Sequence, residues 1–474
     1  MSDELPEGWT KSRLGAVAES ISYGYTARAT ITAKGPRYLR ITDIQNNSVD
    51  WASVPSCIIA AKRIPAYRLR SGDLVFARTG ATTGKSFLIS SCPEAVFASY
   101  LIRVRPATSL VPEFIARFFH SASYWSQISE NISGSAQPNC NATKLSSLVV
   151  PIPPLAEQRR IVAKLEKLLS HADSCHQRLV KVPALLKRFR QSVLGAACSG
   201  RLTADWRDTH KKVRSAQDLV QSLKTPDPES YLDIFERTSG GEIPEMWSWV
   251  SLGKLGPLTG GGTPSKSNPR FWGGNIPWVS PKDMKRNRID DSEDHITDLA
   301  LQNSSVSTIN AGAILFVVRG MILIHTLPTA ITDTAVTLNQ DMKALVPEIK
   351  EMSEYLALAA RHIAPSILFE VKEATHGTRR IESSILKNWA VPVPPLEEQQ
   401  EIVRRVEKLL ALADRLELRL AEVRRRVDSL TQAVLSKAFR GELVPTEFEL
   451  AKAEGRSFES ATELLHRIGR NGKN

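Results

Sequence analysis

The segment VPIPPLAEQRRIVAKLEKLLSHADS at residues 150–174 recurs as VPVPPLEEQQEIVRRVEKLLALADR at residues 391–415, a constant offset of 241 residues. The two copies align without a gap and are identical at 15 of 25 positions. They also end alike, because GRL at 200–202 matches GEL at 441–443 at the same offset. The chain is therefore two half-molecules in tandem, each a module followed by the shared segment.

Each copy of the segment predicts a long helix. A proline-rich lead-in favours extended backbone, and after it apolar residues recur in alternating steps of four and three. A 3.5-residue repeat held over four to five heptads is typical of a coiled coil, whereas two separate amphipathic helices would have to keep heptad phase by chance. The predicted seam contains Ile161, Leu165, Leu168, Leu179 and Leu186 in the first helix, and Ile402, Val406, Leu409, Leu416, Leu420 and Val427 in the second.

Glycines predict where the two helices end, and a proline predicts a kink. The first is expected to end near Gly195 or Gly200 and the second near Gly441. Pro183 predicts a kink in the first helix alone. Two such helices in one chain can pair antiparallel across a pseudo-two-fold axis and hold the modules apart. A duplicated molecule most easily contacts a partner that is itself two-part, and DNA is the obvious candidate.

The two modules share only a framework. LPEGW at 5–9 answers IPEMW at 243–247, and GDLVFARTG at 72–80 matches GAILFVVRG at 312–320. Short runs rich in Val, Ile and Phe between turn residues predict strands. Because the framework is alike and the interiors differ, the two modules are expected to share a fold and to read different things.

One helix is predicted in each module, at 112–131 and at 351–369, with Pro365 breaking the second. The fold class is therefore α+β: two mixed α/β globular domains separated by two long helices that form an antiparallel coiled coil, with pseudo-two-fold symmetry. SAQDL at 215–219 is echoed by SATEL at 460–464, and residues 225–229 are expected to form a linker. The expected order is domain 1 at 1–154, helix at 155–200, linker with a short helix at 201–242, domain 2 at 243–395, helix at 396–440, and a tail with a short helix at 441–474.

Composition narrows the class of partner. The 474 residues carry a net charge of +12 and an isoelectric point near 9.5, which favours a polyanion, although basic balance alone fits other partners too. Five scattered cysteines without a CxxC pair indicate neither a zinc site nor a disulfide framework. No apolar run approaches the roughly 18 residues of a membrane span, and the polar start has no signal-peptide core. A cytoplasmic protein without membrane contact is expected.

Cationic and polar side chains on turns between predicted strands are candidates for contacts with phosphates or base edges. Solvated loop charges are the alternative for any single residue. The candidate DNA-binding residues are Arg78, Thr79, Lys85, Ser135, Gln137, Thr263, Lys282, Arg319, Thr378, Arg379 and Arg380.

The main catalytic candidate is GATTGKS at residues 80–86, which resembles a phosphate-binding loop. It is one residue too short, because the motif needs four residues between its glycines to wrap the phosphates. The second module keeps Gly320 without the following Gly-Lys. We therefore expect a tight hairpin, no catalytic residue and no metal site. A nucleotide-dependent enzyme built on this loop, or a coiled-coil scaffold without DNA contact, remains an alternative.

The chain resembles the specificity subunits of type I restriction-modification enzymes. The likeness covers nearly the whole chain, through the LPEGW-type opening, GGTPSKSNPRFWGGNIPWV at 261–279, GDLVFARTGATTGKS at 72–86 and the twice-present PxPPLxEQ. The first module lacks the full GGTPS…IPWV ribbon and has GYT at 24–26 and RYLR at 37–40 instead.

The resemblance implies that the modules are target recognition domains, each reading one half of a bipartite double-stranded DNA site. It also implies two methyltransferase subunits, which bring S-adenosylmethionine, and two motor-nuclease subunits, which use ATP and Mg. This chain would then be the non-catalytic reader and assembly hub, with no cofactor of its own. The candidate docking residues, chosen because the two copies are nearly identical there, are Glu157, Gln158, Arg159, Glu398 and Gln399.

Overall fold

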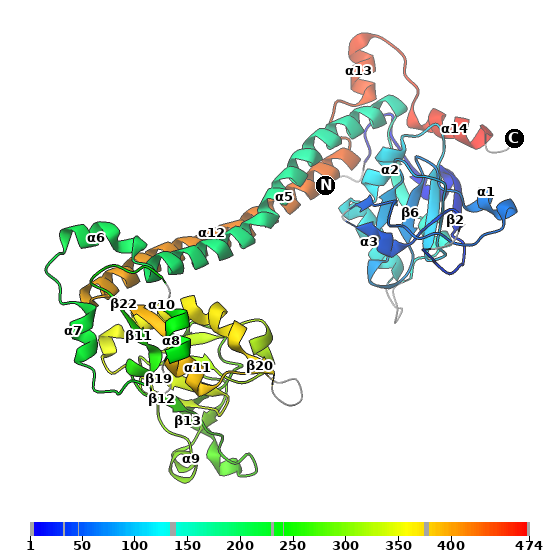
Figure 1. Cartoon of the computed structure of the whole chain (residues 1–474). Helices are drawn as coiled ribbons and strands as arrows, with labels where there is room; N and C mark the ends of the chain where they lie inside the picture. Colours follow the sequence, from blue (N-terminus) through cyan, green and yellow to red (C-terminus); the bar gives the residue numbers. More distant parts are fainter. Residues whose placement is uncertain are drawn as a thin grey trace. The chain divides into compact units, whose positions relative to one another are not determined.

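The computed structural model of the chain describes residues 4–31, 34–45, 47–132, 139–228, 232–239, 241–373 and 379–471 (Figure 1). The chain divides into two compact units. Unit 1 comprises Met1–Val180 and Ala421–Asn474, and unit 2 comprises Lys181–Leu420. Each unit therefore combines one module with part of both long helices.

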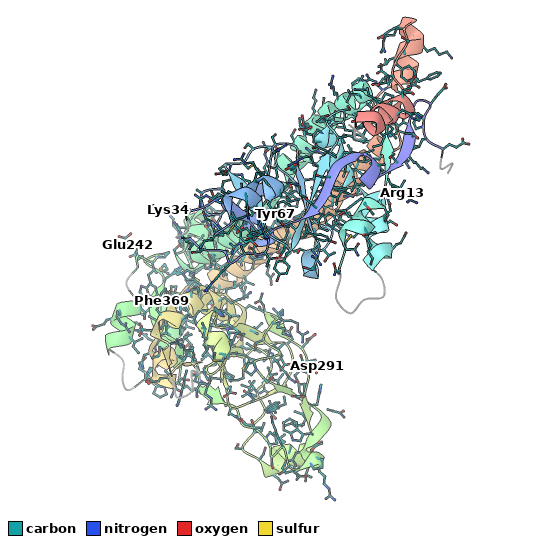
Figure 2. All side chains as sticks on the ribbon, turned by 90° about the vertical axis from the view of Figure 1, so that its right-hand side faces the viewer. Arg13, Lys34, Tyr67, Glu242, Asp291 and Phe369 are labelled. Carbon is teal, nitrogen blue, oxygen red and sulfur yellow. The ribbon has the colours of Figure 1, made fainter. Side chains whose placement is uncertain are left out.

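Unit 1 is built around a four-stranded antiparallel sheet in the order β2-β9-β6-β7. Its strands are β2 (Ala18–Tyr23), β9 (Leu101–Pro106), β6 (Leu74–Ala77) and β7 (Ser86–Leu88). Three pairs flank it: β1 (Thr10–Arg13) with β10 (Val149–Ile152), β4 (Ile44–Gln45) with β5 (Ser48–Val49), and the parallel pair β3 (Arg37–Leu39) with β8 (Ala95–Phe97). Tyr67, labelled in Figure 2, packs against this parallel pair with its ring 6.5 Å from that of Phe97.

The helices of unit 1, apart from the two long ones, are α1 (Ile64–Tyr67), α2 (Pro112–Phe118), α3 (Ala122–Ile132), α4 (Ala142–Ser146), α13 (Glu447–Glu454) and α14 (Ala461–Asn471). The single helix predicted at 112–131 is therefore two helices. The chain turns at Ser121, whose buried hydroxyl accepts a hydrogen bond from the amide of Tyr124 (3.3 Å) and so starts a new helix.

Unit 2 repeats this strand order as β12-β19-β16-β17, with β14 added at the edge. The strands are β12 (Leu258–Gly260), β19 (Met342–Leu345), β16 (Ile314–Val317), β17 (Thr329–Thr332) and β14 (Arg288–Ile289). The parallel pair also recurs, between β13 (Trp272–Val279) and β18 (Thr337–Leu338), and β15 (His295–Ile296) extends it. β11 (Ser248–Ser251) pairs with β22 (Ala390–Val393), and β20 (Lys372–Glu373) with β21 (Arg379–Arg380). The predicted duplication of an α+β module is confirmed.

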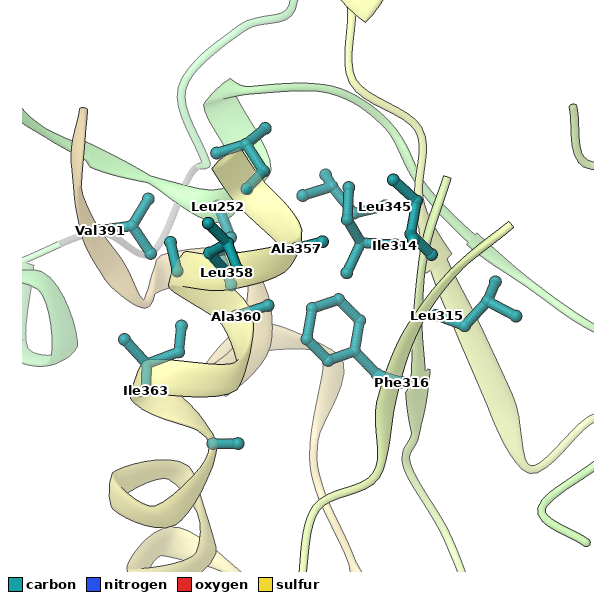
Figure 3. Close-up of a cluster of buried hydrophobic side chains, with 14 of the residues drawn as sticks. Leu252, Ile314, Leu315, Phe316, Leu345, Ala357, Leu358, Ala360, Ile363 and Val391 are labelled. Atoms are coloured by element: carbon teal, nitrogen blue, oxygen red, sulfur yellow. The ribbon is translucent and has the colours of Figure 1, made fainter. Parts of the chain in front are cut away.

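The shorter helices of unit 2 are α6 (Ala204–Thr209), α7 (Ala216–Gln221), α8 (Leu232–Thr238), α9 (Asp298–Asn303), α10 (Ser353–Ile367) and α11 (Ser383–Asn388). The core forms where α10 lies on β16, and Figure 3 shows Ala357 and Ala360 of the helix beside Phe316 of the strand. All four residues of β16 are buried, as are all four of β6, which explains why both strands are continuous apolar runs.

Pro365 does not break α10, contrary to the prediction. It lies inside the helix, which continues to Ile367. Pro365 is exposed, so water can satisfy the backbone carbonyl that loses its partner. Phe369, labelled in Figure 2, follows the helix and is 91% exposed.

The two long helices, α5 (Leu155–Cys198) and α12 (Leu396–Phe439), have 44 residues each and are roughly 66 Å long. In unit 1 the start of α5 and the end of α12 share one buried cluster, which includes Ile161 and Leu435. In unit 2 the end of α5 and the start of α12 share another, which includes Val193 and Ile402. The helices are thus antiparallel within each unit, and their ends belong to the cores of the modules.

Most of the predicted seam is buried or half-buried, but Leu416 is 44% exposed and the prediction is wrong there. Two paired helices bury only a narrow stripe, so a seam residue away from the modules keeps solvent contact. The heptad phase also fails near the end of α12, where Leu430 is 63% exposed and Leu435 is buried. At that end the helix faces a globular module, so the buried face differs from a coiled-coil seam.

Left-handed glycines end both long helices. Gly200 has φ +74° and Gly441 has φ +75°. A Cβ atom would lie 2.4 Å from Pro244 Cγ at Gly200 and 2.3 Å from Pro6 Cγ at Gly441. Only glycine fits both the backbone conformation and the close approach. Of the two glycines considered for the first helix, Gly200 is the terminator, and Gly195 lies inside α5. Helix α5 also continues through Pro183, and a kink at this residue stays a prediction.

The two similar segments at 215–219 and 460–464 make equivalent contacts in the two units. The amide of Ala216 donates to the carbonyl of Met246 (3.0 Å), and the amide of Ala461 donates to that of Gly8 (2.9 Å). Each segment therefore binds the opening of one module. Part of the expected linker is bound as well, because the amides of Lys224 and Thr225 donate to the Glu348 carboxylate (2.7 and 2.9 Å). Glu229, at the end of the expected linker, lies outside the described residues.

We expect Leu435→Ala to lower the free energy of unfolding by about 2–5 kcal/mol, because it opens a cavity in a closed core. Leu430→Ala is the matched control on the same helix and should stay within about 0.5 kcal/mol of the parent chain. Urea unfolding of the two variants measures the difference. Equal losses would contradict the observed burial and favour an unbroken heptad seam.

Candidate nucleic-acid interface

The second turn site, which we define as Arg319, Asp341, Arg379 and Arg380, lies at the end of β16. The backbone of the turn is held on both sides. On one side the amides of Val318 and Arg319 donate to the carbonyl of Asp341 (2.8 and 3.3 Å). On the other side the amide of Gly320 donates to the carbonyl of Arg379 (3.0 Å), and the backbones of Arg319 and Arg380 form an isolated antiparallel β-bridge. Three of the predicted DNA-binding residues of this module are therefore neighbours.

The first turn site, defined as Arg78, Thr79, Tyr100 and Asn139, occupies the equivalent place after β6. The amide of Arg78 donates to the carbonyl of Tyr100 (3.1 Å), Cys140 donates to Arg78 (2.9 Å), and Thr79 bridges Asn139. Residues of the two turn sites correspond at offsets of 240 and 241. The same backbone frame thus presents different side chains, with Thr79 and Tyr100 where the second module has Arg319 and Asp341.

Aromatic side chains distinguish the first turn site. The guanidinium of Arg78 lies 4.9 Å from the centre of the Tyr23 ring, a cation–π contact. Tyr100 is 67% exposed. Exposed aromatic rings beside an arginine can stack on or pack against nucleotides. Sequence reasoning did not single out Tyr23 and Tyr100, although the 241-residue offset places Tyr100 against Asp341.

The second turn site is cationic. Arg319 pairs with Asp341 through Nε (2.9 Å to Oδ1), and its side chain is 50% exposed. Lys343, on the adjacent strand β19, has a pKa below its usual range, because burial and then the charges of Lys387 and Arg380 disfavour another cation. This surplus of positive charge suits a polyanion.

The remaining predicted contacts lie elsewhere in their modules. Lys85 is exposed at the start of β7. The hydroxyl of Thr263 donates to the side chain of Gln340. Lys282 lies 2.9 Å from Asp294 and 3.2 Å from Glu293, and the hydrogen bond that its ammonium donates to Asp294 raises the pKa of Lys282 above the usual range. Two acids around one lysine make that surface unattractive to phosphate. Ser135, Gln137 and Thr378 lie outside the described residues.

The loop at 80–86 is a hairpin, as predicted. Antiparallel strands β6 and β7 flank it, the amide of Ala77 donates to Lys85 (2.8 Å), and the hydroxyl of Thr83 closes the turn on the carbonyl of Gly80 (2.7 Å). A nucleotide-binding P-loop leads from a strand into a helix, whose amides hold the phosphates. No helix follows here, so the geometry does not favour nucleotide binding.

A buried carboxylate, that of Glu157, connects three distant segments of unit 1. Glu157, in the first turn of α5, is fully buried. It accepts hydrogen bonds from the indole of Trp9 (2.9 Å) and the amide of Glu447 (2.9 Å). Burial raises the pKa of this carboxyl, although these two hydrogen bonds act against the shift. Glu447 in turn pairs with Arg160 and Arg456, both at 2.6 Å.

Unit 2 repeats the arrangement with Glu398 of α12, also fully buried. It accepts from the indole of Trp247 (2.8 Å), the hydroxyl of Thr203 (2.6 Å) and the guanidinium of Arg207 (2.6 Å). In both units the tryptophan opens the module, the glutamate begins a helix, and the third partner follows the other helix. These contacts connect the two repeated motifs that sequence analysis found separately.

Four of the five candidate docking residues are therefore wrong as accessible contacts. Glu157, Gln158, Glu398 and Gln399 are at most 1% exposed. Their repetition reflects shared internal hydrogen bonds: the side-chain amides of Gln158 and Gln399 each donate to a proline carbonyl five residues earlier (2.9 Å). Arg159 alone of the five is exposed.

The described helices include none that is long and apolar enough to cross a membrane. The same residues contain no group of three or more His, Cys, Asp or Glu side chains placed to hold a metal ion.

Fold and turn sites together define a class of protein: a duplicated α+β molecule in which equivalent turns carry an arginine beside aromatic rings in the first module and several arginines in the second, both suited to nucleic acid. Residues 6–184 and 244–424 match the "Type I restriction modification DNA specificity domain". The chain belongs to this family, and the resemblance noted in its sequence is confirmed.

Relatives agree with this assignment. The chain is 29% identical over 450 residues to the EcoKI specificity subunit of Escherichia coli K12, covering 93% of this chain and 90% of that one. It is 41% identical over 185 residues to the EcoR124I/EcoR124II specificity subunit of Escherichia coli, covering 39% of this chain and 45% of that one. Both relatives, like this chain, are type I specificity subunits.

Solved structures share the fold. One, described under "complex assembly and conformational transition of the type I R-M system", matches with a TM-score of 0.66 at 23% identity, over 93% of this chain and all of that one. The HsdS subunit of Thermoanaerobacter tengcongensis matches with a TM-score of 0.55 at 22% identity, over 93% and 98% of the chains.

We expect Glu157→Gln to destabilise unit 1 and Glu398→Gln to destabilise unit 2, each by about 1–3 kcal/mol. Donors approach both carboxylate oxygens, so an amide NH₂ would face another donor. Hydrogen exchange should then rise around 6–13 and 441–464 for the first variant, and around 200–219 and 244–251 for the second. Glu166→Gln, at an exposed position of α5, is the control. Unchanged exchange in both variants would show that these hydrogen bonds do not hold the units together.

Proposed function

We propose that this chain is the non-catalytic reader of a type I restriction-modification complex, and that its two modules recognise the halves of a bipartite double-stranded DNA site. One observation carries the proposal: the two modules have the same strand order but different side chains at equivalent turns. A reader of two unlike half-sites requires this combination. The net charge of +12 supports a polyanionic partner.

The chemistry belongs to partner subunits in this proposal. The chain binds two methyltransferase subunits, which carry S-adenosylmethionine, and two motor-nuclease subunits, which use ATP and Mg. It binds no cofactor itself and works in the cytoplasm. Exposed faces of α5 and α12, including Arg159, are the docking candidates, because the buried glutamates and glutamines are occupied by contacts within each unit.

The long helices set the gap between half-sites. They are continuous over 44 residues each, and in each unit the helix ends belong to that unit's buried core. A rigid spacer converts its length into a fixed number of unspecified base pairs.

Co-expression of the chain with its methyltransferase subunit should methylate adenines within a motif of two short specified halves and a fixed unspecified gap. Single-molecule sequencing of modified adenines in the host reads this motif directly. A host with the methyltransferase alone is the control and should lack it. A contiguous motif would contradict the two-module reading, and methylation independent of this chain would contradict its role as reader.

Inserting four residues into both long helices should lengthen the gap by one or two base pairs and leave both halves unchanged, because four helical residues add about 6 Å. Positions after Val180 and Leu420 suit the insertions, since the guanidinium of Arg424 donates to the carbonyl of Leu179 (2.8 Å) at that level. The same insertion at Gly455, which has open space around it, is the control. An unchanged gap in the helix variant would exclude the spacer role.

A further inference from the structure

We propose that Arg319, oriented by Asp341, reads a guanine in the half-site bound by the second module. The inference rests on the proposed function and assigns a specificity-determining residue within it. It comes from the contacts of the second turn site and from their absence at the equivalent turn of the first module.

The backbone of Arg319 is held more firmly than a surface turn requires. Its neighbours Val318 and Gly320 are hydrogen-bonded to different segments, at Asp341 and at Arg379. The bridge to Arg380 completes the clamp. The point from which the side chain leaves the sheet is therefore fixed, and a recognition residue on such a frame loses little entropy on binding.

An ion pair orients the side chain as well. Asp341 Oδ1 lies 2.9 Å from Nε of Arg319 without accepting a hydrogen bond from it, and the backbone amide of Asp341 donates to Asn339 Oδ1 (2.8 Å). Asn339 is buried, whereas the Arg319 side chain is 50% exposed. Exposure therefore increases from the Asn339 amide through the Asp341 carboxylate to the Arg319 guanidinium. This arrangement orients the arginine toward solvent.

An arginine whose Nε faces a carboxylate leaves its two terminal amino groups available as a planar fork. Guanine offers two acceptors, O6 and N7, at the spacing of that fork in the major groove. Adenine places an amino donor where guanine has O6, so the same fork meets donor with donor. The carboxylate also lowers the net charge at the arginine, which favours a neutral base edge over a phosphate.

Two other paired cations of the module, Lys282 and Arg288, do not meet these conditions. Lys282 lies between Glu293 and Asp294, and Arg288 between Asp333 and Glu354, so each group carries excess negative charge. The Arg319–Asp341 pair instead has Arg380 beside it and Lys343 on the adjacent strand. The surroundings of this pair are therefore more attractive to DNA than those of Lys282 or Arg288.

The equivalent described positions of the first module do not form such a pair. Thr79 and Tyr100 stand at the positions of Arg319 and Asp341, so both members of the pair are replaced together. The inference consequently predicts an effect in one half of the bipartite motif only.

The test uses the full chain co-expressed with its methyltransferase and reads the methylated motif by single-molecule sequencing. In Arg319→Ala, the preference for guanine at one position of one half should relax by about 10- to 100-fold, with the other half unchanged. Asp341→Asn should relax the same position to a smaller extent. Arg286→Ala removes an exposed cation of the same module and is the control that should leave the motif intact.

Arg319→Lys separates base reading from charge, because lysine keeps the positive charge and loses the planar fork. Arg319→Lys should relax the preference for guanine at the same position. A uniform loss of methylation without any change of motif in Arg319→Ala, together with an intact motif in Arg319→Lys, would identify a phosphate contact and overturn the proposal.

An atom-level test uses the purified complex and a duplex in which the implicated guanine is replaced by 7-deazaguanine. The parent complex should bind this duplex about tenfold more weakly, and the Arg319→Ala complex should not distinguish the two duplexes. Equal binding by the parent complex would overturn the inference. A parent chain that gives no bipartite motif would instead reject the proposed function, so the two failures are distinguishable.

Discussion

A buried glutamate at the start of each long helix is the constraint on which the architecture depends. Glu157 and Glu398 each accept an indole hydrogen bond from the tryptophan that opens the module, 148 and 151 residues earlier in the chain. Each also accepts from the segment that follows the other long helix. One side chain thus joins three distant pieces of chain, and the helix cannot leave the module without exposing unsatisfied donors.

The two units compensate the buried charge differently. In unit 2 the guanidinium of Arg207 contacts Glu398 directly. In unit 1 the donors to Glu157 are neutral, and the nearest ion pairs belong to Glu447, with Arg160 and Arg456. Burial works against ionisation of Glu447, yet the hydrogen bonds from the two arginines hold its pKa below the usual range. The hydrogen-bond topology is repeated, while the charges that balance it are not.

Periodicity and repetition predicted the long helices, their antiparallel pairing, the duplicated α+β module and the hairpin at 80–86, because these depend on local pattern and copy number. The same patterns could not tell burial from exposure. Near-identity of Glu157 and Glu398 reads equally well as a shared docking surface or a shared internal contact, and only the position of Trp9 and Trp247 decides between them. The prediction failed at Leu416 because a heptad pattern does not say where a partner helix gives way to solvent.

The turn sites show how one frame serves two readings. Their frame consists of backbone hydrogen bonds. The amide of the residue before Thr79 or Arg319 donates to the carbonyl of Tyr100 or Asp341, and the carbonyl of that same residue accepts from the segment at 139–140 or 379–381. Backbone atoms are the same for every residue, so exchanging Thr79 and Tyr100 for Arg319 and Asp341 leaves the frame intact. Packing, by contrast, commits the buried strands β6 and β16 to apolar side chains. Stability and recognition therefore use different atoms at adjacent positions, and side chains at the turns can differ between modules without cost to the fold that holds them.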